Sequence, residues 1–167
     1  MSLPVVVLVG PPGAGKSTVG LLVAERLGVG FRDTDTDIAT AEGKDISTIF
    51  YDAGEPHFRA LETAAVARAL AEHEGVLALG GGAVLSAGTR DALAAHTVVF
   101  LDVGLPTAVK RVGLSRDRPV LALNPRAMLR TLLAERRPLY EEVATHTVDT
   151  DEVEAGQVAD TVVGLLK

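Results

Sequence analysis

The sequence predicts an α/β fold built on a parallel sheet, and three observations support this class. Short apolar runs rich in β-branched residues, without polar alternation, occur at 4–9, 76–79 and 98–101, as expected for strands covered on both faces. Segments long enough for helices separate these runs and carry apolar residues at helical spacing. The length of 167 residues and the apolar fraction of 47% suit one domain with its own core. Such alternation of strands and helices favours a parallel sheet.

The amino-terminal part of the chain carries a strand, a helix and a second strand. The run 4–9 ends at Gly10, which interrupts it before a glycine-rich loop. From Lys16 the apolar residues follow a helical period until Gly28, which suits a helix C-cap. The short segment 30–32 has the pattern of a second strand.

The rest of the chain alternates in the same way. Pro56 suits a first helical position, and the helical pattern that follows it stops at Gly75. Another helix opens at Pro125, and a weaker strand is expected near 147–149. Asp151 is expected to cap the last helix.

Composition and charge exclude several classes of protein. The 16 basic and 22 acidic residues give a net charge of −6, so the broad positive surface of a nucleic-acid-binding protein is absent. With no cysteine, the chain has no disulfide, thiolate metal site or cysteine nucleophile. No apolar run reaches the roughly 20 residues that cross a bilayer, and no export signal is visible. We therefore expect a cytoplasmic protein that binds neither nucleic acids nor membranes.

The loop after the first strand carries a complete G-x-x-x-x-G-K-[ST] motif, from Gly10 to Ser17. Its glycines let backbone N–H groups curl around phosphate oxygens, and the helix N-terminus adds a favourable partial charge. Lys16 can reach the outer phosphates, while the Ser17 hydroxyl can ligate Mg²⁺. A plain glycine turn is the alternative, but the position between a strand and a helix favours a nucleoside triphosphate site. The chain also lacks the Asn-Lys-x-Asp signature that reads guanine, which disfavours a Ras-like GTPase.

Two aspartates, Asp33 and Asp35, come directly after the second expected strand. Because ligands of α/β proteins bind at the carboxyl ends of the strands, we expect both carboxylates to share one pocket with the phosphate loop. One could hold a water molecule of Mg²⁺, and the other could accept a proton from an attacking hydroxyl. Turn capping is the alternative for this pair, and Asp37 has the pattern of a helix cap.

Arginines gather in one stretch of this acidic chain. Seven of the twelve arginines lie between Arg111 and Arg137, and the local charge of that stretch is +5. A solvated basic helix face is the ordinary explanation. Because residues 112–124 show little apolar periodicity, a lid that carries Arg118 over the transferring phosphates is the sharper hypothesis.

Three consecutive glycines, Gly80 to Gly82, follow the apolar run 76–79. Glycine weakens a strand end, so three together make sense where a ligand approaches the backbone closely. This segment is a further candidate element of the site, beside the phosphate loop and the two aspartates.

Taken together, these motifs resemble the shikimate kinase family, and the resemblance spans nearly the whole chain. It implies the nucleoside monophosphate kinase fold of the P-loop NTPases, with three α/β/α layers and a five-stranded parallel sheet in order 2-3-1-4-5. It also implies a single kinase domain over residues 1–167, with a substrate-binding region at about 34–62 and a lid at about 112–124. The motifs are GPPGAGKST at 10–18, DTD at 33–35, GEPHFRALE at 54–62, LGGGAV at 79–84, DRPVL at 117–121 and ERRPLY at 135–140.

The resemblance implies transfer of the γ-phosphoryl group of ATP to the 3-hydroxyl of shikimate by a monomeric enzyme that uses Mg²⁺. Lys16, Asp35 and Arg118 would be its catalytic residues, with Asp35 binding the acceptor hydroxyls as the candidate base. Ser17 and Asp33 would hold the metal. The nucleotide-binding residues that it implies are Gly13, Ala14, Gly15, Lys16, Ser17, Thr18, Arg111 and Arg118.

Two arginines, Arg59 and Arg136, would grip the carboxylate of shikimate, since a planar carboxylate suits guanidinium forks. By the same resemblance, the backbone of Gly81 and Gly82 would assist them, and Glu62 would support Arg59.

Two other functions stay open on the residues alone. A kinase of this fold could act on another polyol acid such as gluconate, although the paired arginines and the triple glycine favour shikimate. A nucleotide-binding regulator without catalysis is the second alternative. Such a regulator would have no physical need of Lys16, Asp35 and Arg118 together.

Overall fold

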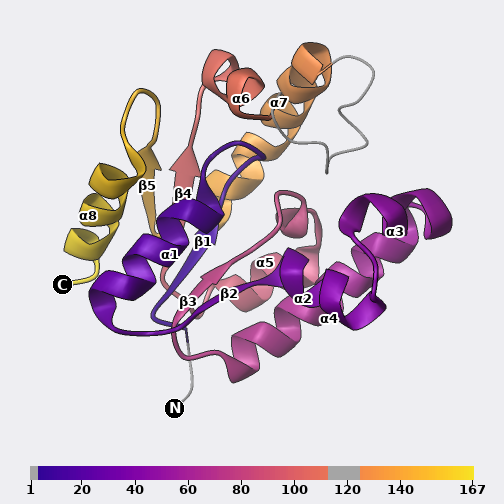
Figure 1. Ribbon diagram of the computed structural model, residues 1–167, viewed down its shortest axis with the longest axis horizontal. Coiled ribbons are helices and arrows are strands. Elements are labelled where there is room, and N and C mark those ends of the chain that lie inside the picture. Colours follow the sequence, from indigo (N-terminus) through magenta and orange to yellow (C-terminus); the bar gives the residue numbers. More distant parts are fainter. Residues whose placement is uncertain (1–3, 113–124) are drawn as a thin grey trace.

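The computed structural model describes residues 4–112 and 125–167, and a parallel sheet organises this part of the chain (Figure 1). The strands are β1 (Val6–Val9), β2 (Phe31–Asp33), β3 (Val76–Ala78), β4 (Val98–Asp102) and β5 (His146–Asp149). The helices are α1 (Lys16–Leu27), α2 (Thr34–Glu42), α3 (Ile46–Ala53), α4 (Glu55–Glu72), α5 (Ala87–Leu93), α6 (Leu105–Val112), α7 (Pro125–Val143) and α8 (Ala155–Leu165), with a short 3-10 helix, η1 (Ala83–Leu85). None of these helices combines the length and the apolar character that crossing a membrane requires.

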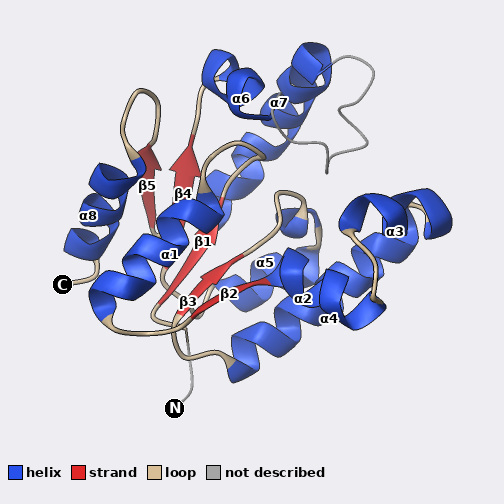
Figure 2. Cartoon of the chain, in the orientation of Figure 1, coloured by secondary structure: helices blue, strands red, loops and turns tan. Residues whose placement is uncertain are grey.

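The sheet separates two apolar layers, because successive residues of a strand point to opposite faces. Val6 and Leu8 of β1 pack in one layer with α1 and α8. Val7 and Val9 pack in the other with α4, α5 and the end of α7. Figure 2 shows helices on both sides of the sheet. The predicted three-layer architecture is confirmed, and burial on both faces explains why the strands are apolar throughout.

The strand order is β2-β3-β1-β4-β5, as the family resemblance implies. Val7 in the central strand β1 pairs with Leu77 of β3 on one side and with Val98 of β4 on the other. The neighbouring strands β2, β3 and β1 are parallel, so the segments that follow them leave the sheet at the same edge. The phosphate loop, the two aspartates and the three glycines are these segments, and the topology therefore brings them together.

The stretch between β2 and α4 forms two helices, α2 and α3, which the sequence analysis did not predict. A small apolar cluster, separate from the two layers of the sheet, holds both helices against α4. Its buried members include Ile38 of α2, Ile49 of α3 and Phe58 of α4. This cluster fixes the start of α2, and with it Asp35, relative to α4.

Two helix-cap predictions are wrong. Asp151 does not cap the last helix; its carboxylate accepts the N–H of Gly104 at 3.0 Å and ties the chain after β5 to the chain after β4. Asp37 lies inside α2, and Asp33 caps that helix instead, accepting the N–H of Asp35 at 2.8 Å. In the case of Asp151 the partner lies far away in the sequence, so local pattern could not reveal it.

Gly20 is needed for the packing of α1 on the sheet, and its replacement by alanine tests this. Alanine is favoured over glycine inside a helix by about 1 kcal/mol. A methyl group at Gly20 would collide with the Phe31 ring and lie 3.3 Å from Leu8 Cδ1, and overpacking of this kind costs about 1–3 kcal/mol. We expect Gly20→Ala to lower the free energy of unfolding in urea by about 1 kcal/mol.

Gly164→Ala on α8 is the matched control, because nothing lies within 4 Å of the added methyl group. We expect this variant to be slightly more stable than the wild type, since only helix propensity acts there. A stabilised Gly20→Ala variant would refute the close packing of α1 on β2.

Candidate active site

The phosphate loop runs from the end of β1 into the first turn of α1. Gly13 and Gly15 take the left-handed backbone conformation, with φ of 85° and 87°, which a residue with a side chain adopts only at a cost. Lys16 Nζ arches back over the loop and donates to the carbonyls of Gly10 at 2.6 Å and Pro11 at 3.1 Å. The first turn of α1 contains no acidic residue. The loop is therefore a cationic cradle suited to phosphate groups.

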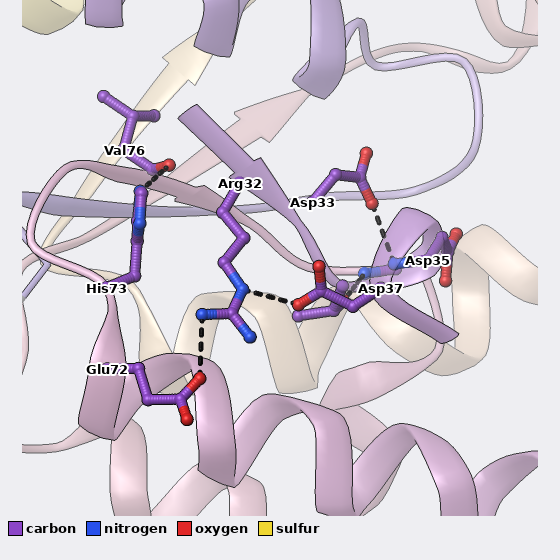
Figure 3. Close-up of polar contacts among 9 residues, drawn as sticks. Arg32, Asp33, Asp35, Asp37, Glu72, His73 and Val76 are labelled. Carbon is purple, nitrogen blue, oxygen red and sulfur yellow. Dashed lines mark hydrogen bonds and ion pairs between the residues drawn. The ribbon is translucent and has the colours of Figure 1, made fainter. Parts of the chain in front are cut away.

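Ser17 and Asp33 meet across the carboxyl edge of the sheet. Ser17 Oγ donates to Asp33 Oδ2 at 2.8 Å. The other carboxylate oxygen of Asp33 accepts the N–H of Asp35 (Figure 3). One oxygen of Asp33 therefore caps α2, as turn capping predicts, and the other lies at the phosphate loop, where the metal role stays a prediction. Within the described ranges no three His, Asp or Glu side chains gather as a metal cage. A hydroxyl and a carboxylate beside a phosphate cradle fit Mg²⁺, which takes few protein ligands and keeps water and phosphate oxygens.

Glu62 and Arg59, both on α4, form the charged centre of a second part of the site. The Glu62 carboxylate is only 3% exposed, and Arg59 Nη1 donates to its Oε1 at 2.8 Å. Arg59 also contacts the more exposed Glu55 at 3.1 Å. Its guanidinium lies over the rings of Phe50 and Phe58, at 5.8 and 5.3 Å from their centroids. These contacts hold a cation rigidly in place without enclosing it fully.

The glycine segment after β3 passes directly over this charged centre. A Cβ on Gly80 would lie 2.5 Å from Asp35 Oδ1 and 2.9 Å from Glu62 Oε2. A Cβ on Gly82 would lie 2.6 Å from Arg59 Cζ. The groups that lie close to Gly80 and Gly82 are side chains of the site itself, so the approach of a ligand to this backbone stays a prediction. A side chain at Gly80 or Gly82 would force these groups to move.

Arg136 of α7 belongs to the same cluster. It is 8% exposed, and its charge acts on both Glu62 and Tyr140. Burial raises the pKa of Glu62 above its ordinary value, Arg59 opposes this rise, and the negative charge of Asp35 adds to it. A buried carboxylate of this kind is stable only beside positive charge, so Glu62 explains why two arginines gather here.

Arg111, on α6, borders the phosphate loop on another side. It donates to the carbonyl of Gly13 at 2.9 Å and to the carbonyl of Thr150 at 3.1 Å, tying the loop to the chain after β5. Two hollows adjoin it, of about 280 and about 460 Å³. Thr18 lines the smaller one, and residues 152–154 line the larger. They offer room beside the phosphate loop for the rest of a nucleotide.

The sequence analysis assigned no role to several residues that lie near the site. Arg32 donates from Nε to Asp37 at 2.6 Å and from Nη1 to Glu72 at 3.1 Å, so it links β2 to α2 and α4 (Figure 3). Buried Thr34 accepts the N–H of Gly80 through its hydroxyl at 3.3 Å. Buried Tyr140 donates to the carbonyl of Gly81. Thr34 and Tyr140 lie within the DTD and ERRPLY motifs. The motifs draw attention to these residues but do not show which groups they bind.

The predicted site residues fall into two neighbouring groups, and Asp33 links them. Arg118 and the predicted lid beyond Val112 lie outside the described residues. The group around the phosphate loop comprises Gly13, Ala14, Gly15, Lys16, Ser17, Thr18 and Arg111. The group around the glycine segment comprises Asp35, Arg59, Glu62, Gly81, Gly82 and Arg136.

This sheet order, with a phosphate loop after β1 and aspartates after β2, defines a P-loop kinase, an ATP-dependent phosphotransferase that acts on a hydroxyl group. The model of the family described as shikimate kinase matches residues 12–167. The chain belongs to the shikimate kinase family.

Individual relatives agree with this assignment. The shikimate kinase of Salinispora arenicola is 62% identical over 163 residues, which cover 98% of each chain. That of Streptomyces avermitilis is 59% identical over 167 residues, covering 100% of this chain and 98% of the relative. The structure of Acinetobacter baumannii shikimate kinase in complex with shikimate has a TM-score of 0.94 and 38% identity, covering 99% of this chain and 93% of that one. The alternatives of a gluconate kinase and a regulator are therefore set aside.

The buried Glu62 predicts a pH dependence of stability. Since the folded-state pKa of Glu62 lies above its unfolded value, the folded chain keeps this proton longer than the unfolded chain. Stability linked to Glu62 is therefore complete below the ordinary glutamate pKa and is lost as the pH rises through the raised value. We expect the melting temperature of the wild type to fall relative to that of Glu62→Gln as the pH rises from acidic toward neutral.

Glu55→Gln removes the exposed carboxylate on the same arginine and is the matched control. We expect its melting temperature to follow that of the wild type across the pH range. Parallel pH profiles for the wild type and Glu62→Gln would contradict the burial of an ionisable Glu62.

Proposed function

We propose that this site transfers the γ-phosphoryl group of ATP to the 3-hydroxyl of shikimate, with the acceptor bound between Asp35 and the two arginines. The observation that carries the proposal is the cluster of Asp35, Arg59 and Glu62 around the glycine segment, directly beside the phosphate loop. A Cβ on Gly81 would lie 3.0 Å from Pro12 Cδ, so the two groups of residues adjoin. One side of the site suits phosphates, and the other suits a small carboxylate that carries hydroxyl groups.

The phosphate loop would bind the triphosphate through its backbone N–H groups and Lys16. Ser17 and Asp33 would hold Mg²⁺, which would supply positive charge against the phosphates. Arg111 and the two hollows beside it would receive the nucleoside. The full set of nucleotide-binding residues is the one predicted above, including Arg118, whose role stays a prediction from the sequence.

Asp35 would act on the acceptor hydroxyl. As the hydroxyl oxygen bonds to the γ-phosphorus and the bond to ADP breaks, its proton would pass to the Asp35 carboxylate. Two features support this role. The Asp33 carboxylate caps α2 by accepting the N–H of Asp35, which holds Asp35 at the start of the helix, and Asp35 Oδ1 lies against Gly80. Arg59 and Arg136 would grip the acceptor carboxylate and so aim the hydroxyl at the phosphate, since positioning supplies much of the catalysis in phosphoryl transfer.

We extend the proposal to a monomer that works in the cytoplasm, where ATP is available. The monomer is what the family resemblance implies. The proposed ligands are ATP, shikimate and Mg²⁺.

An acceptor panel tests this function. ADP release from ATP would be measured with Mg²⁺ and shikimate, gluconate, AMP or no acceptor, with Asp35→Asn as the blank. We expect turnover with shikimate alone. Turnover with gluconate would overturn the proposed acceptor, and no turnover with any acceptor, despite ATP binding, would favour a nucleotide-binding regulator.

Arg136→Ala separates acceptor binding from nucleotide binding. We expect shikimate affinity to fall about 30-fold, or about 2 kcal/mol, because a charged hydrogen bond is lost, while ATP affinity stays the same. Calorimetric titration of each ligand measures both. Arg130→Ala removes an exposed arginine from the same helix and should bind shikimate as the wild type does. Equal shikimate affinity for Arg136→Ala and the wild type would remove Arg136 from the acceptor site.

A further inference from the structure

Tyr140 of α7 is a buried tyrosine whose hydroxyl reaches the glycine segment. The residue is 1% exposed, and its ring packs on Phe100 of β4 with 5.0 Å between centroids. Its Oη donates to the carbonyl oxygen of Gly81 at 2.6 Å. A buried tyrosine hydroxyl needs a partner, but any nearby carbonyl would satisfy it. Here the partner is a carbonyl in a run of three glycines, which have unusual backbone freedom.

This hydrogen bond fixes the orientation of one particular peptide group. The carbonyl of Gly81 and the N–H of Gly82 belong to the same planar trans peptide and point in opposite directions. Holding the oxygen toward Tyr140 therefore turns the Gly82 N–H away from it. Gly82 lies against the Arg59 guanidinium, so this N–H is fixed beside one of the two arginines that we propose to grip the acceptor.

The other end of the segment is held as well. The N–H of Gly80 donates to Thr34 Oγ1 at 3.3 Å, and Thr34 directly precedes Asp35. Among the residues that the structure describes, the N–H groups of Gly81 and Gly82 donate to no protein acceptor, so they are available to a ligand. Glycine has more backbone freedom to lose than any other residue, and restricting it before a ligand arrives favours binding.

Tyr140 also shares a face of α7 with Arg136, four residues earlier. Burial raises the pKa of Tyr140 to about 12, so its hydroxyl stays protonated and keeps donating at any ordinary pH. One face of one helix therefore presents both a cation for the acceptor and an anchor for the neighbouring backbone.

We propose that Tyr140 is a positioning residue for the acceptor, orienting the Gly81–Gly82 peptide so that the N–H of Gly82 meets the acceptor carboxylate. The inference rests on the proposed function, because it takes shikimate as the acceptor. Tyr140 itself touches no reacting atom. It acts through the glycine backbone, and its loss affects the binding of the acceptor rather than the chemical step.

Tyr140→Phe tests the proposal, because it removes the hydroxyl and leaves the ring on Phe100. We expect KM and Kd for shikimate to rise about five- to tenfold, as for loss of one hydrogen bond, with kcat and the KM for ATP within about twofold of the wild type. Steady-state kinetics and calorimetry supply these values. An unchanged shikimate KM together with a lower melting temperature would overturn the proposal, since Tyr140 would then serve stability alone.

Two further variants sharpen the test. Phe100→Leu loosens the packing of the Tyr140 ring but keeps its hydroxyl, and we expect a lower melting temperature with an unchanged shikimate KM. Thr34→Val removes the anchor at the other end of the segment and should raise the shikimate KM in the same direction as Tyr140→Phe. If Tyr140→Phe does not fold, an unchanged KM in Thr34→Val contradicts the claim that the orientation of this segment limits acceptor binding.

Measurements on the wild type separate failure of the proposed function from failure of the role of Tyr140. A wild-type chain that neither binds nor phosphorylates shikimate refutes the proposed function. A wild-type chain that does both, with equal shikimate affinity in Tyr140→Phe, refutes only the role of Tyr140.

Discussion

The buried carboxylate of Glu62 is the constraint on which the acceptor side of this molecule depends. A charge with 3% exposure is costly unless it is paired, and Arg59 at 2.8 Å supplies the pairing. Because Gly80 lies directly against Glu62 and Asp35, a side chain at this position would force their carboxylates to move. The buried charge of Glu62 thus accounts for the position of Arg59, for the glycine at position 80 and for the accumulation of charge beside Asp35.

The strand order turns these local requirements into one site. Since β2, β3 and β1 are adjacent and parallel, their carboxyl ends deliver Asp33, the glycine segment and the phosphate loop to the same edge of the sheet (Figure 1). Two hydrogen bonds then set the relative positions: Ser17 binds Asp33, and Thr34 receives the N–H of Gly80. The phosphate loop and the proposed acceptor site therefore share one scaffold, as phosphoryl transfer requires when its catalysis is mostly positioning.

The sequence predicted the parts of the site that local pattern encodes. The phosphate loop and the DTD motif carry their chemistry within a few residues, and the sheet edge explains why they meet. The burial of Glu62 had no such signal, because a carboxylate three residues after Arg59 on a helix looks like an ordinary surface pair. Asp151 was misread as a cap because its partner lies 47 positions away. The helices α2 and α3 were not predicted: α2 has little apolar period of its own, and the helical spacing of Ile46, Ile49 and Phe50 in α3 was overlooked.

The most direct test of this account is a crystal structure of the chain with shikimate and a non-hydrolysable ATP analogue. The account predicts that the shikimate carboxylate lies within about 3.2 Å of the Arg59 and Arg136 guanidinium groups, with the 3-hydroxyl at hydrogen-bond distance from Asp35. It also predicts the analogue's phosphates on Lys16 and Ser17. A shikimate molecule that turns its carboxylate away from both arginines, or holds its 3-hydroxyl away from Asp35, would contradict the central claim.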